Sequence, residues 1–436
     1  MTSADRFDRR LESSVAELAT PRFPDYFDDI LAVTSRTRQR RAWTFPGRWI
    51  PMADISRERA LAPGVPWRAL GILVTVLLVV LLAVATIVGS QRRLPAPFGP
   101  ARNGSVLRVD NAALYAIDPG TGASRLLLAD ANNVGGSTTE SAAYFDSPAY
   151  SLDGTRLAFF RTHAGTQTDL FVADADGSRP VKLNAEPLVE AQMLAWSPDG
   201  RSIAVGLGDD PNGGRVAIAH PDRTGITLLD LGMPLAEPAW RPPDGRDLLV
   251  RGVIDDVPRL FLVHPDGTDL RPLGAPGSAD RYDLGQGAWS PDGTRIAYLI
   301  DQQDPYQARV HAIDADGSGH VVLSVAPEGI QDYRPVWSPD GRSIAVFRWR
   351  YADGNTSDRW VAVIPSDGSG PGVEGTNLVR GASGGEWGIA WSPDGTRVVA
   401  VNATTQQVVS IDPATGATTT LPWTSSQAPS WQRLAP

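Results

Sequence analysis

One residue in the chain has the sequence context of a nucleophile, Ser383 within Gly381-Ala-Ser-Gly-Gly385. The stretch matches the Gly-x-Ser-x-Gly pattern of hydrolases, in which a strand–turn–helix setting exposes the serine, and an acid and a histidine follow it. No histidine follows Ser383. We therefore predict a flexible Gly/Ser loop here and no catalytic residue.

Acidic residues and histidines could instead bind a metal. Two Asp-x-Asp-Gly stretches, at Asp174/Asp176 and Asp314/Asp316, are similar to part of a calcium loop. A complete calcium loop needs further spaced acids and a terminal Glu, which neither stretch has, so we predict hairpin turns. The absence of cysteine excludes disulfides, thiol catalysis and cysteine-based zinc sites. The five histidines show no metal-ligand spacing and are predicted to be surface groups: His163, His220, His264, His311 and His320.

The elements that would position any site are defined by a repeat. Trp-Ser-Pro-Asp-Gly occurs at Trp196–Gly200, Trp289–Gly293, Trp337–Gly341 and Trp391–Gly395, and degraded copies occur at Tyr150–Gly154 and Trp240–Gly245. The six copies are 44 to 54 residues apart. A repeat period of this length is typical of propellers and other repeat arrays.

The chemistry of the motif predicts a tight turn. Proline presets the second turn position, and glycine accepts the left-handed backbone without a Cβ clash. The tryptophan ends the preceding strand and can fill the space between neighbouring sheets. A second signature follows, as in Asp169–Gly177, Arg309–Gly317 and Val408–Gly416, where apolar alternation leads into another turn. One repeat therefore predicts four antiparallel strands, which form one propeller blade.

The number of blades depends on the two ends of the propeller region. Residues 106–109, 114–117 and 125–128 predict three strands that lack an inner, Trp-containing strand. Pro429-Ser-Trp431-Gln-Arg433 supplies that missing pattern at the other end. We therefore predict an all-β, seven-bladed propeller closed by a composite blade over residues 105–436. A six-bladed ring with the N-terminal strands packed elsewhere is the alternative.

The repeat Trp-Ser-Pro-Asp-Gly-x-x-Ile-Ala resembles that of TolB-like propellers and is similar to the propeller domain of the prolyl oligopeptidase family. The resemblance covers about residues 105–436 and implies a fold rather than an activity. In TolB-like proteins the propeller serves protein–protein contacts. In the oligopeptidase family it gates a separate hydrolase domain, which we do not expect here.

The residues before the propeller predict a membrane anchor. Ala69–Val88 is a run of 20 uncharged residues, of which 14 are Leu, Ile or Val. This length and composition match a membrane-spanning helix. Residues 31–68 carry 8 Arg and 2 acids, so the positive-inside rule places the N-terminus in the cytoplasm and the propeller outside. Residues 89–104 are predicted to be a linker.

Residues 1–68 are predicted to be a partly disordered cytoplasmic segment with short helices at 4–19 and from Pro24 onward. An aromatic patch follows, which could contact either an anionic membrane surface or a partner protein: Trp43, Phe45, Trp49, Ile50 and Met52. The layout of helical segment, single span and external domain is similar to that of membrane-anchored anti-sigma factors, with Phe23–Met52 as the region in question. That resemblance implies a sigma factor or another cytosolic regulator as the partner.

The distribution of charge argues against nucleic acid as a partner. Residues 1–68 carry a formal +3, so the total of −9 leaves −12 for the remainder. An acidic propeller lacks the clustered Lys and Arg that phosphate contacts require, and we predict no nucleic-acid binding. Arginine predominates over lysine, as in bacteria with GC-rich genomes.

These patterns lead to three hypotheses about function. The first is a sensor or regulator whose propeller binds an external protein, peptide or glycan and signals to residues 1–68. The second is an anchored scaffold of a cell-envelope complex, as in TolB-like proteins. The third is a hydrolase or lyase that uses the propeller funnel. We expect no enzymatic activity, no cofactor and no metal, and the sequence assigns no binding residues.

Overall fold

The computed structural model describes residues 98–435, with gaps at 111–112, 130–142, 164–166, 209–213, 223–224, 256, 275–286, 304–305, 352–356, 376–387 and 403–404. The predicted cytoplasmic segment, the span Ala69–Val88 and most of the predicted linker lie outside these residues. Ser383 does as well. Among the described residues no helix is long and apolar enough to cross a membrane.

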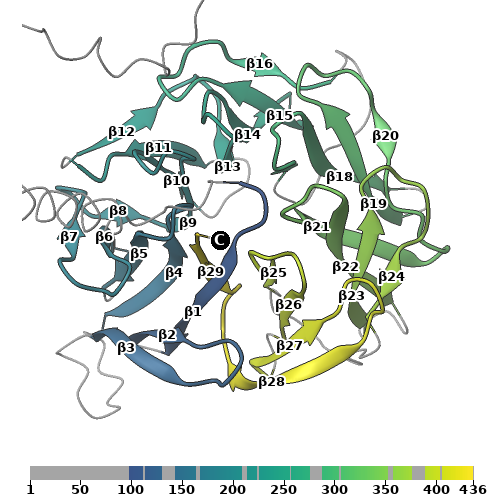
Figure 1. The fold of residues 1–436 in the computed structure, drawn as a ribbon. Coiled ribbons are helices and arrows are strands. Elements are labelled where there is room, and N and C mark those ends of the chain that lie inside the picture. Colours follow the sequence, from purple (N-terminus) through teal and green to yellow (C-terminus); the bar gives the residue numbers. More distant parts are fainter. Residues whose placement is uncertain are drawn as a thin grey trace, which may run out of the picture. The chain divides into compact units, whose positions relative to one another are not determined.

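The described residues form seven antiparallel sheets arranged as blades around a common axis (Figure 1). Blade 1 contains β4 (Tyr144–Tyr150), β5 (Arg156–Thr162), β6 (Gln167–Asp174) and β7 (Val181–Lys182), with β8 (Leu188–Val189) paired to β6. Blade 2 contains β9 (Ala191–Trp196), β10 (Ile203–Leu207), β11 (Arg215–Ala219) and β12 (Ile226–Leu229). Blade 3 contains β13 (Leu235–Trp240), β14 (Leu248–Ile254), β15 (Val257–Val263) and β16 (Arg271–Pro272).

The remaining blades follow the same plan. Blade 4 contains β17 (Ala288–Trp289), β18 (Arg295–Gln303), β19 (Tyr306–Asp314) and β20 (Val321–Val322). Blade 5 contains β21 (Ile330–Trp337), β22 (Ser343–Tyr351), β23 (Ser357–Pro365) and β24 (Val373–Glu374). Blade 6 contains β25 (Ile389–Trp391), β26 (Val398–Val401), β27 (Gln407–Ile411) and β28 (Thr418–Thr424).

Blade 7 is the predicted composite blade, and it closes the ring. Its strands are β29 (Ser430–Leu434), β1 (Arg102–Asp110), β2 (Ala113–Ile117) and β3 (Ser124–Ala129), in that order. The inner strand β29 pairs antiparallel with β1, with Val106 opposite Trp431 and Leu107 opposite Ser430. The seven-bladed prediction is therefore confirmed, and the six-bladed alternative is wrong.

The start of the propeller differs from the prediction. Strand β1 begins at Arg102, three residues before the expected boundary and inside the predicted linker. Arg102 pairs with Leu434, and Asn103 pairs with Arg433. The C-terminal strand thus recruits residues whose own sequence has no strand character, a pairing that local pattern cannot reveal.

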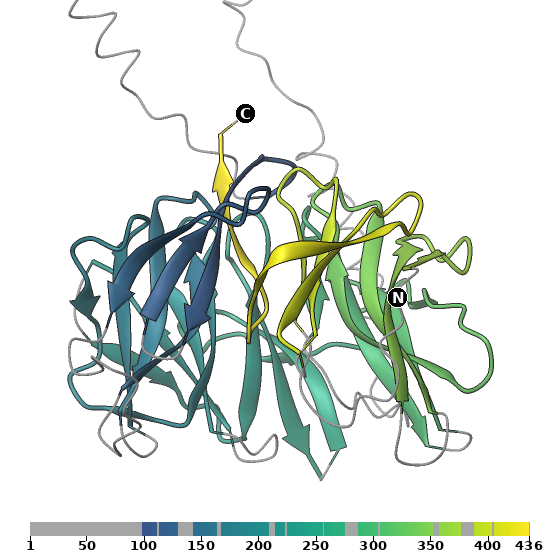
Figure 2. The ribbon, with the colours of Figure 1, turned by 90° about the horizontal axis from the view of Figure 1, so that it is seen from below.

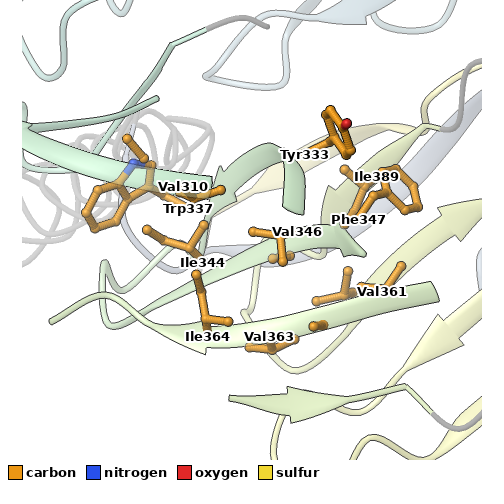
Figure 3. Packing of buried hydrophobic residues seen from close by; sticks show 14 of the residues in the cluster. Val310, Tyr333, Trp337, Ile344, Val346, Phe347, Val361, Val363, Ile364 and Ile389 are labelled. Atoms are coloured by element: carbon orange, nitrogen blue, oxygen red, sulfur yellow. The ribbon is translucent and has the colours of Figure 1, made fainter. Parts of the chain in front are cut away.

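The core lies between neighbouring blades. Figure 3 shows the cluster around blade 5, in which Val346 and Val361 belong to the blade itself. Val310 from β19 and Ile389 from β25 pack against it from the neighbouring blades. Because every blade is apolar on both faces, its middle strands are buried as near-continuous apolar runs, as in Ile203–Leu207.

The two ends of the described chain meet at one face of the propeller. In the side view, the beginning of β1 and the end of β29 lie at the same face (Figure 2). Strand β29 is the inner strand of blade 7 and ends at this face. In blades 1 to 6 the inner strand ends in the Ser-Pro-Asp-Gly turn or its degraded copy, so these turns lie around the axis at the same face. We call this the turn face.

Candidate binding site

The Ser-Pro-Asp-Gly turns owe their shape to hydrogen bonds within each turn. In blade 4, Ser290 Oγ donates to Asp292 Oδ1 at 2.6 Å, and the same oxygen accepts Thr294 N at 3.1 Å and Thr294 Oγ1 at 2.8 Å. Gly293 has φ +68°, and a Cβ added there would lie 1.8 Å from the carbonyl oxygen of Pro242. Only glycine fits this close approach to the neighbouring blade, which explains its place in the motif.

The aspartates of four of these turns are held in the ionised form. Burial raises the pKa of Asp292, but the hydrogen bonds from Ser290 and Thr294 outweigh it and lower the pKa below its ordinary value. The pKa of the corresponding acid is lowered in three other turns, at Asp153, Asp340 and Asp394. These four turns therefore place carboxylates at the turn face that stay charged at neutral pH.

The tryptophans of the motif join each blade to the one before it. Each indole N–H donates to a backbone carbonyl of the preceding blade. The acceptor is the residue just before that blade's own motif tryptophan, or before Tyr150 in blade 1. Five such bonds, 2.9 to 3.3 Å long, connect blades 1 to 6: Trp196 to Ala149, Trp240 to Ala195, Trp289 to Ala239, Trp337 to Ala288 and Trp391 to Val336. The repeat therefore positions the turns through a hydrogen bond as well as through packing.

Arginines cover several of these rings. The guanidinium of Arg156 lies 5.3 Å from the centroid of the Trp196 ring, and that of Arg295 lies 6.0 Å from the centroid of Trp337. Arg241 lies 5.3 Å from the Trp289 centroid, and its Nε donates to the carbonyl of Gly293 at 3.0 Å. These contacts attach the turns of adjacent blades to each other and fix the shape of the turn face.

The candidate site is a shallow, open cavity at the turn face. It has a volume of about 600 Å³ and is bounded by the turns of blades 3, 4 and 5 and by the segment before β1. Its apolar lining consists of Phe98, Pro100, Pro243, Pro291 and Pro339, and its charged lining consists of Asp292, Asp340 and Arg342. An open hollow with apolar side chains and a few charged groups has the composition of a protein or peptide contact surface.

The segment that forms one wall of the cavity is fastened at both sides. Ala101 N donates to the carbonyl of Pro393 at 2.8 Å, and Asn103 Nδ2 donates to Asp394 Oδ2 at 2.8 Å. Arg433 Nη2 donates to the carbonyl of Gly99 at 2.6 Å. The cavity thus depends on the closed ring, since blade 6 and the C-terminal strand both hold Phe98–Pro100 in place.

Sequence reasoning missed a buried ionic cluster in blade 5. Arg348 Nε donates to Asp332 Oδ1 at 2.9 Å, and both side chains are almost fully buried. Arg348 Nη1 also donates to Glu374 Oε1 at 2.9 Å. Burial raises the pKa of Asp332, and the adjacent guanidinium opposes that rise. Asp332 lies in a strand of mixed polarity, Ile330–Trp337, so the local sequence does not mark it as buried, and only the fold brings Arg348 opposite it.

Acids on two inner strands, which a funnel-based enzyme would need, are engaged in structural pairs. Asp146 Oδ1 accepts a hydrogen bond from Gln427 Nε2 at 2.5 Å, which joins blade 1 to the segment before β29. Glu237 Oε2 lies 3.6 Å from Arg251 Nε. Both acids therefore hold neighbouring segments of the propeller together.

The two Asp-x-Asp-Gly stretches lie in turns closed by backbone hydrogen bonds, from Gly177 N to Asp174 O and from Gly317 N to Asp314 O. In the Asp174/Asp176 turn, Asp176 Oδ1 accepts Ser178 N at 2.9 Å, and Asp174 Oδ2 accepts Arg179 Nε at 2.7 Å. In the second turn Asp316 Oδ1 accepts Ser318 N at 2.9 Å. Among the described residues no group of three or more His, Asp or Glu side chains is arranged to hold a metal.

The histidines differ from one another in burial and in the groups that they contact. His163 Nε2 lies 3.1 Å from Asp169 Oδ2, and His264 Nε2 lies 3.5 Å from Asp247 Oδ1. His311 is buried, with 6% of its surface exposed, so the prediction of a surface group is wrong for this residue. It faces His320, which is exposed.

Comparison with curated proteins finds TolB. The Tol-Pal system protein TolB of Anaeromyxobacter dehalogenans strain 2CP-C is 32% identical over 152 residues, which are 35% of this chain and 31% of that protein. The protein of the same name from Anaeromyxobacter sp. strain K is 31% identical over the same length. This chain therefore spans about a third of the length of these relatives. No family model matches the chain.

Solved structures share the architecture at low identity. A structure from a study of two prolyl endopeptidases aligns with a TM-score of 0.53 and 18% identity over 75% of this chain and 49% of that one. An oligogalacturonate lyase in complex with manganese aligns with a TM-score of 0.50 and 14% identity over 74% of this chain and 85% of that one. At these identities the likeness shows the fold alone. The chain is a seven-bladed β-propeller whose repeats are similar to those of TolB.

Proposed function

We propose that this chain is a recognition module of a cell-envelope protein complex and binds a protein or peptide at its turn face. The cavity beside Phe98 carries this proposal, because it combines an apolar wall with ionised carboxylates at the mouth of a rigid ring. The similarity to the Tol-Pal system protein TolB supports a scaffold of this kind better than it supports a sensor that signals to a sigma factor. The predicted anchor Ala69–Val88 would hold the module at the membrane.

The chemistry of the cavity suggests the character of the partner. Five apolar side chains would contact an apolar or proline-containing segment. Asp292 and Asp340 carry two negative charges against the one positive charge of Arg342, and this balance would favour a cationic residue in the partner. The overall negative charge of the propeller region acts in the same direction, since it steers cationic surfaces toward the ring.

A photo-cross-linking amino acid placed at Phe98 in the full chain tests this proposal in living cells. A matched control carries the same amino acid at Leu228, which is 48% exposed on the outer strand β12. We expect a discrete adduct with an envelope protein from position 98 and no such adduct from position 228. Replacing Asp292 and Asp340 together by Asn should weaken the adduct.

Two results would contradict the proposal. One is the same pattern of adducts from both positions, which would indicate random encounter. The other is an adduct from position 98 that consists only of cytosolic proteins, which would place the turn face on the other side of the membrane.

A further inference from the structure

Blade 4 brings two imidazoles together away from the turn-face cavity. His311 lies on β19 opposite Tyr298, and His320 lies just before β20. His311 Nδ1 and His320 Nε2 are 3.0 Å apart, and their rings are nearly parallel, with an interplanar angle of 16°. Tyr298 packs beside both rings, with centroid distances of 5.9 Å and 6.3 Å. The two nitrogens are thus held side by side by the hairpin turn of one blade.

A nitrogen pair at this distance can share one proton or bind one metal ion. In the first state one imidazole donates its N–H to the lone pair of the other. In the second state both facing nitrogens are deprotonated, and each ring keeps its proton on the opposite nitrogen. Metal binding therefore replaces the shared proton.

The two imidazoles differ in exposure. His311 is buried, with 6% of its surface exposed, so the surrounding blade holds its ring in place. His320 is exposed, which gives an ion access from solvent. The buried ring is preorganised and the exposed ring completes the pair.

The type of donor selects a class of metal. With metal–nitrogen bonds of about 2.0–2.1 Å, two ligands at a right angle are about 2.9 Å apart. The pair therefore needs only a small change from its hydrogen-bonded separation of 3.0 Å to hold one ion. Square-planar and tetragonal sites rich in nitrogen favour Cu²⁺ and Ni²⁺, and affinity is highest for Cu²⁺.

We propose that His311 and His320 form a two-imidazole binding site for Cu²⁺ on the outer part of blade 4. Water molecules fill the remaining coordination positions, because among the described residues no third His, Asp or Glu side chain completes the group. The site is independent of the turn-face cavity and of the partner that binds there.

Electron paramagnetic resonance of the full-length chain with one equivalent of Cu²⁺ tests this site. The protein is purified without a histidine tag and first treated with a chelator. We expect a tetragonal Cu²⁺ signal with hyperfine splitting from two imidazole nitrogens. His320→Ala, on the exposed side of the pair, should remove the two-nitrogen pattern and weaken binding without affecting the fold. His311→Gln should have the same effect on the signal.

The control variants are His163→Ala and His264→Ala, which remove imidazoles that face Asp169 and Asp247 and should leave the spectrum unchanged. A Cu²⁺ spectrum without nitrogen splitting would overturn the proposal. So would a two-nitrogen spectrum that survives His320→Ala, since the ion would then be bound elsewhere.

Discussion

At the scale of single residues, the tryptophan of each repeat does two things. Its ring fills the space between blades, and its N–H satisfies a carbonyl of the preceding inner strand. Blade 7 departs from this rule on both sides. Among the described residues, the buried indole nitrogen of Trp431 has no hydrogen-bond partner. Tyr150 stands where the next tryptophan would be, and its hydroxyl has no partner among these residues either. Burial raises the pKa of Tyr150 to about 12.

Because of this difference, replacing tryptophan by phenylalanine should lower the free energy of unfolding by different amounts in blades 6 and 7. Trp391→Phe removes the N–H that donates to Val336 at 2.9 Å and leaves that carbonyl unsatisfied. Trp431→Phe removes a buried N–H that has no partner in the part of the chain that the structure describes. Both lose similar ring area, so we expect Trp391→Phe to be more destabilising by about 1–2 kcal/mol. Urea unfolding measures the difference, and equal losses for the two variants would contradict a role for the hydrogen bond.

The turn aspartates predict an acid-dependent stability. Their folded pKa lies below the unfolded value of about 3.9, so the unfolded chain binds more protons in that range. The stabilisation is therefore complete above about pH 5 and is lost as the pH falls through 4 toward the folded pKa. Asp292→Asn should lower stability at pH 7 and flatten its dependence between pH 5 and 3.

Urea midpoints measured from pH 3 to 7 check this expectation. Ser290→Ala, which removes a donor but keeps the acid, should flatten the pH dependence less than Asp292→Asn does. Parallel curves for Asp292→Asn and the unmodified chain would show that this carboxylate does not contribute.

At the scale of elements, β29 is the strand on which closure of the ring depends. It is the inner strand of blade 7 and pairs with β1 through Arg102, Asn103, Val106 and Leu107. It also contacts blade 1, because Gln432 Nε2 donates to the carbonyl of Gly154 at 2.9 Å. A five-residue strand thus joins residues more than 300 positions apart in the sequence.

Removing β29 should therefore destabilise the whole ring. A chain that ends at Pro429 loses the Trp431 ring and leaves the inner edge of β1 unpaired. We expect a loss of about 3–5 kcal/mol, the cost of deleting a large aromatic side chain from a packed site. A chain that ends at Leu434 keeps β29 whole and serves as the control. Thermal unfolding compares the two, and matching midpoints would show that the ring does not require the strand.

At the scale of the whole molecule, the proposed function requires the propeller and the N-terminus to lie on opposite sides of the membrane. The chain contains no cysteine, so single cysteines can report on each side. Ser124→Cys lies on the exposed β3 strand, and Ser3→Cys lies in the predicted cytoplasmic segment. We expect an impermeant maleimide to label Ser124→Cys in spheroplasts and to label Ser3→Cys only after lysis. Labelling of both before lysis would contradict the predicted anchor.

The sequence by itself determined the repeat, the four-strand blade and the composite closure, because these rest on local turn chemistry and alternation. Proline and glycine in Ser-Pro-Asp-Gly specify the turn wherever the blade is placed, and the tryptophan marks the end of the inner strand. The candidate site could not be predicted in this way. Its lining comes from Phe98 and from turns up to about 240 residues away in the sequence, and none of these residues is distinctive alone.

Tertiary structure also decided which polar residues meet. His311 and His320 are two of five histidines without distinctive spacing, and the packing of β19 against its own turn buries one and aligns its nitrogen with the other. Asp332 and Arg348 are 16 residues apart, and the register of β21 on β22 places them opposite each other. Local pattern fixes which face a strand buries, but contacts across strands and blades depend on register and ring closure, which are properties of the folded chain.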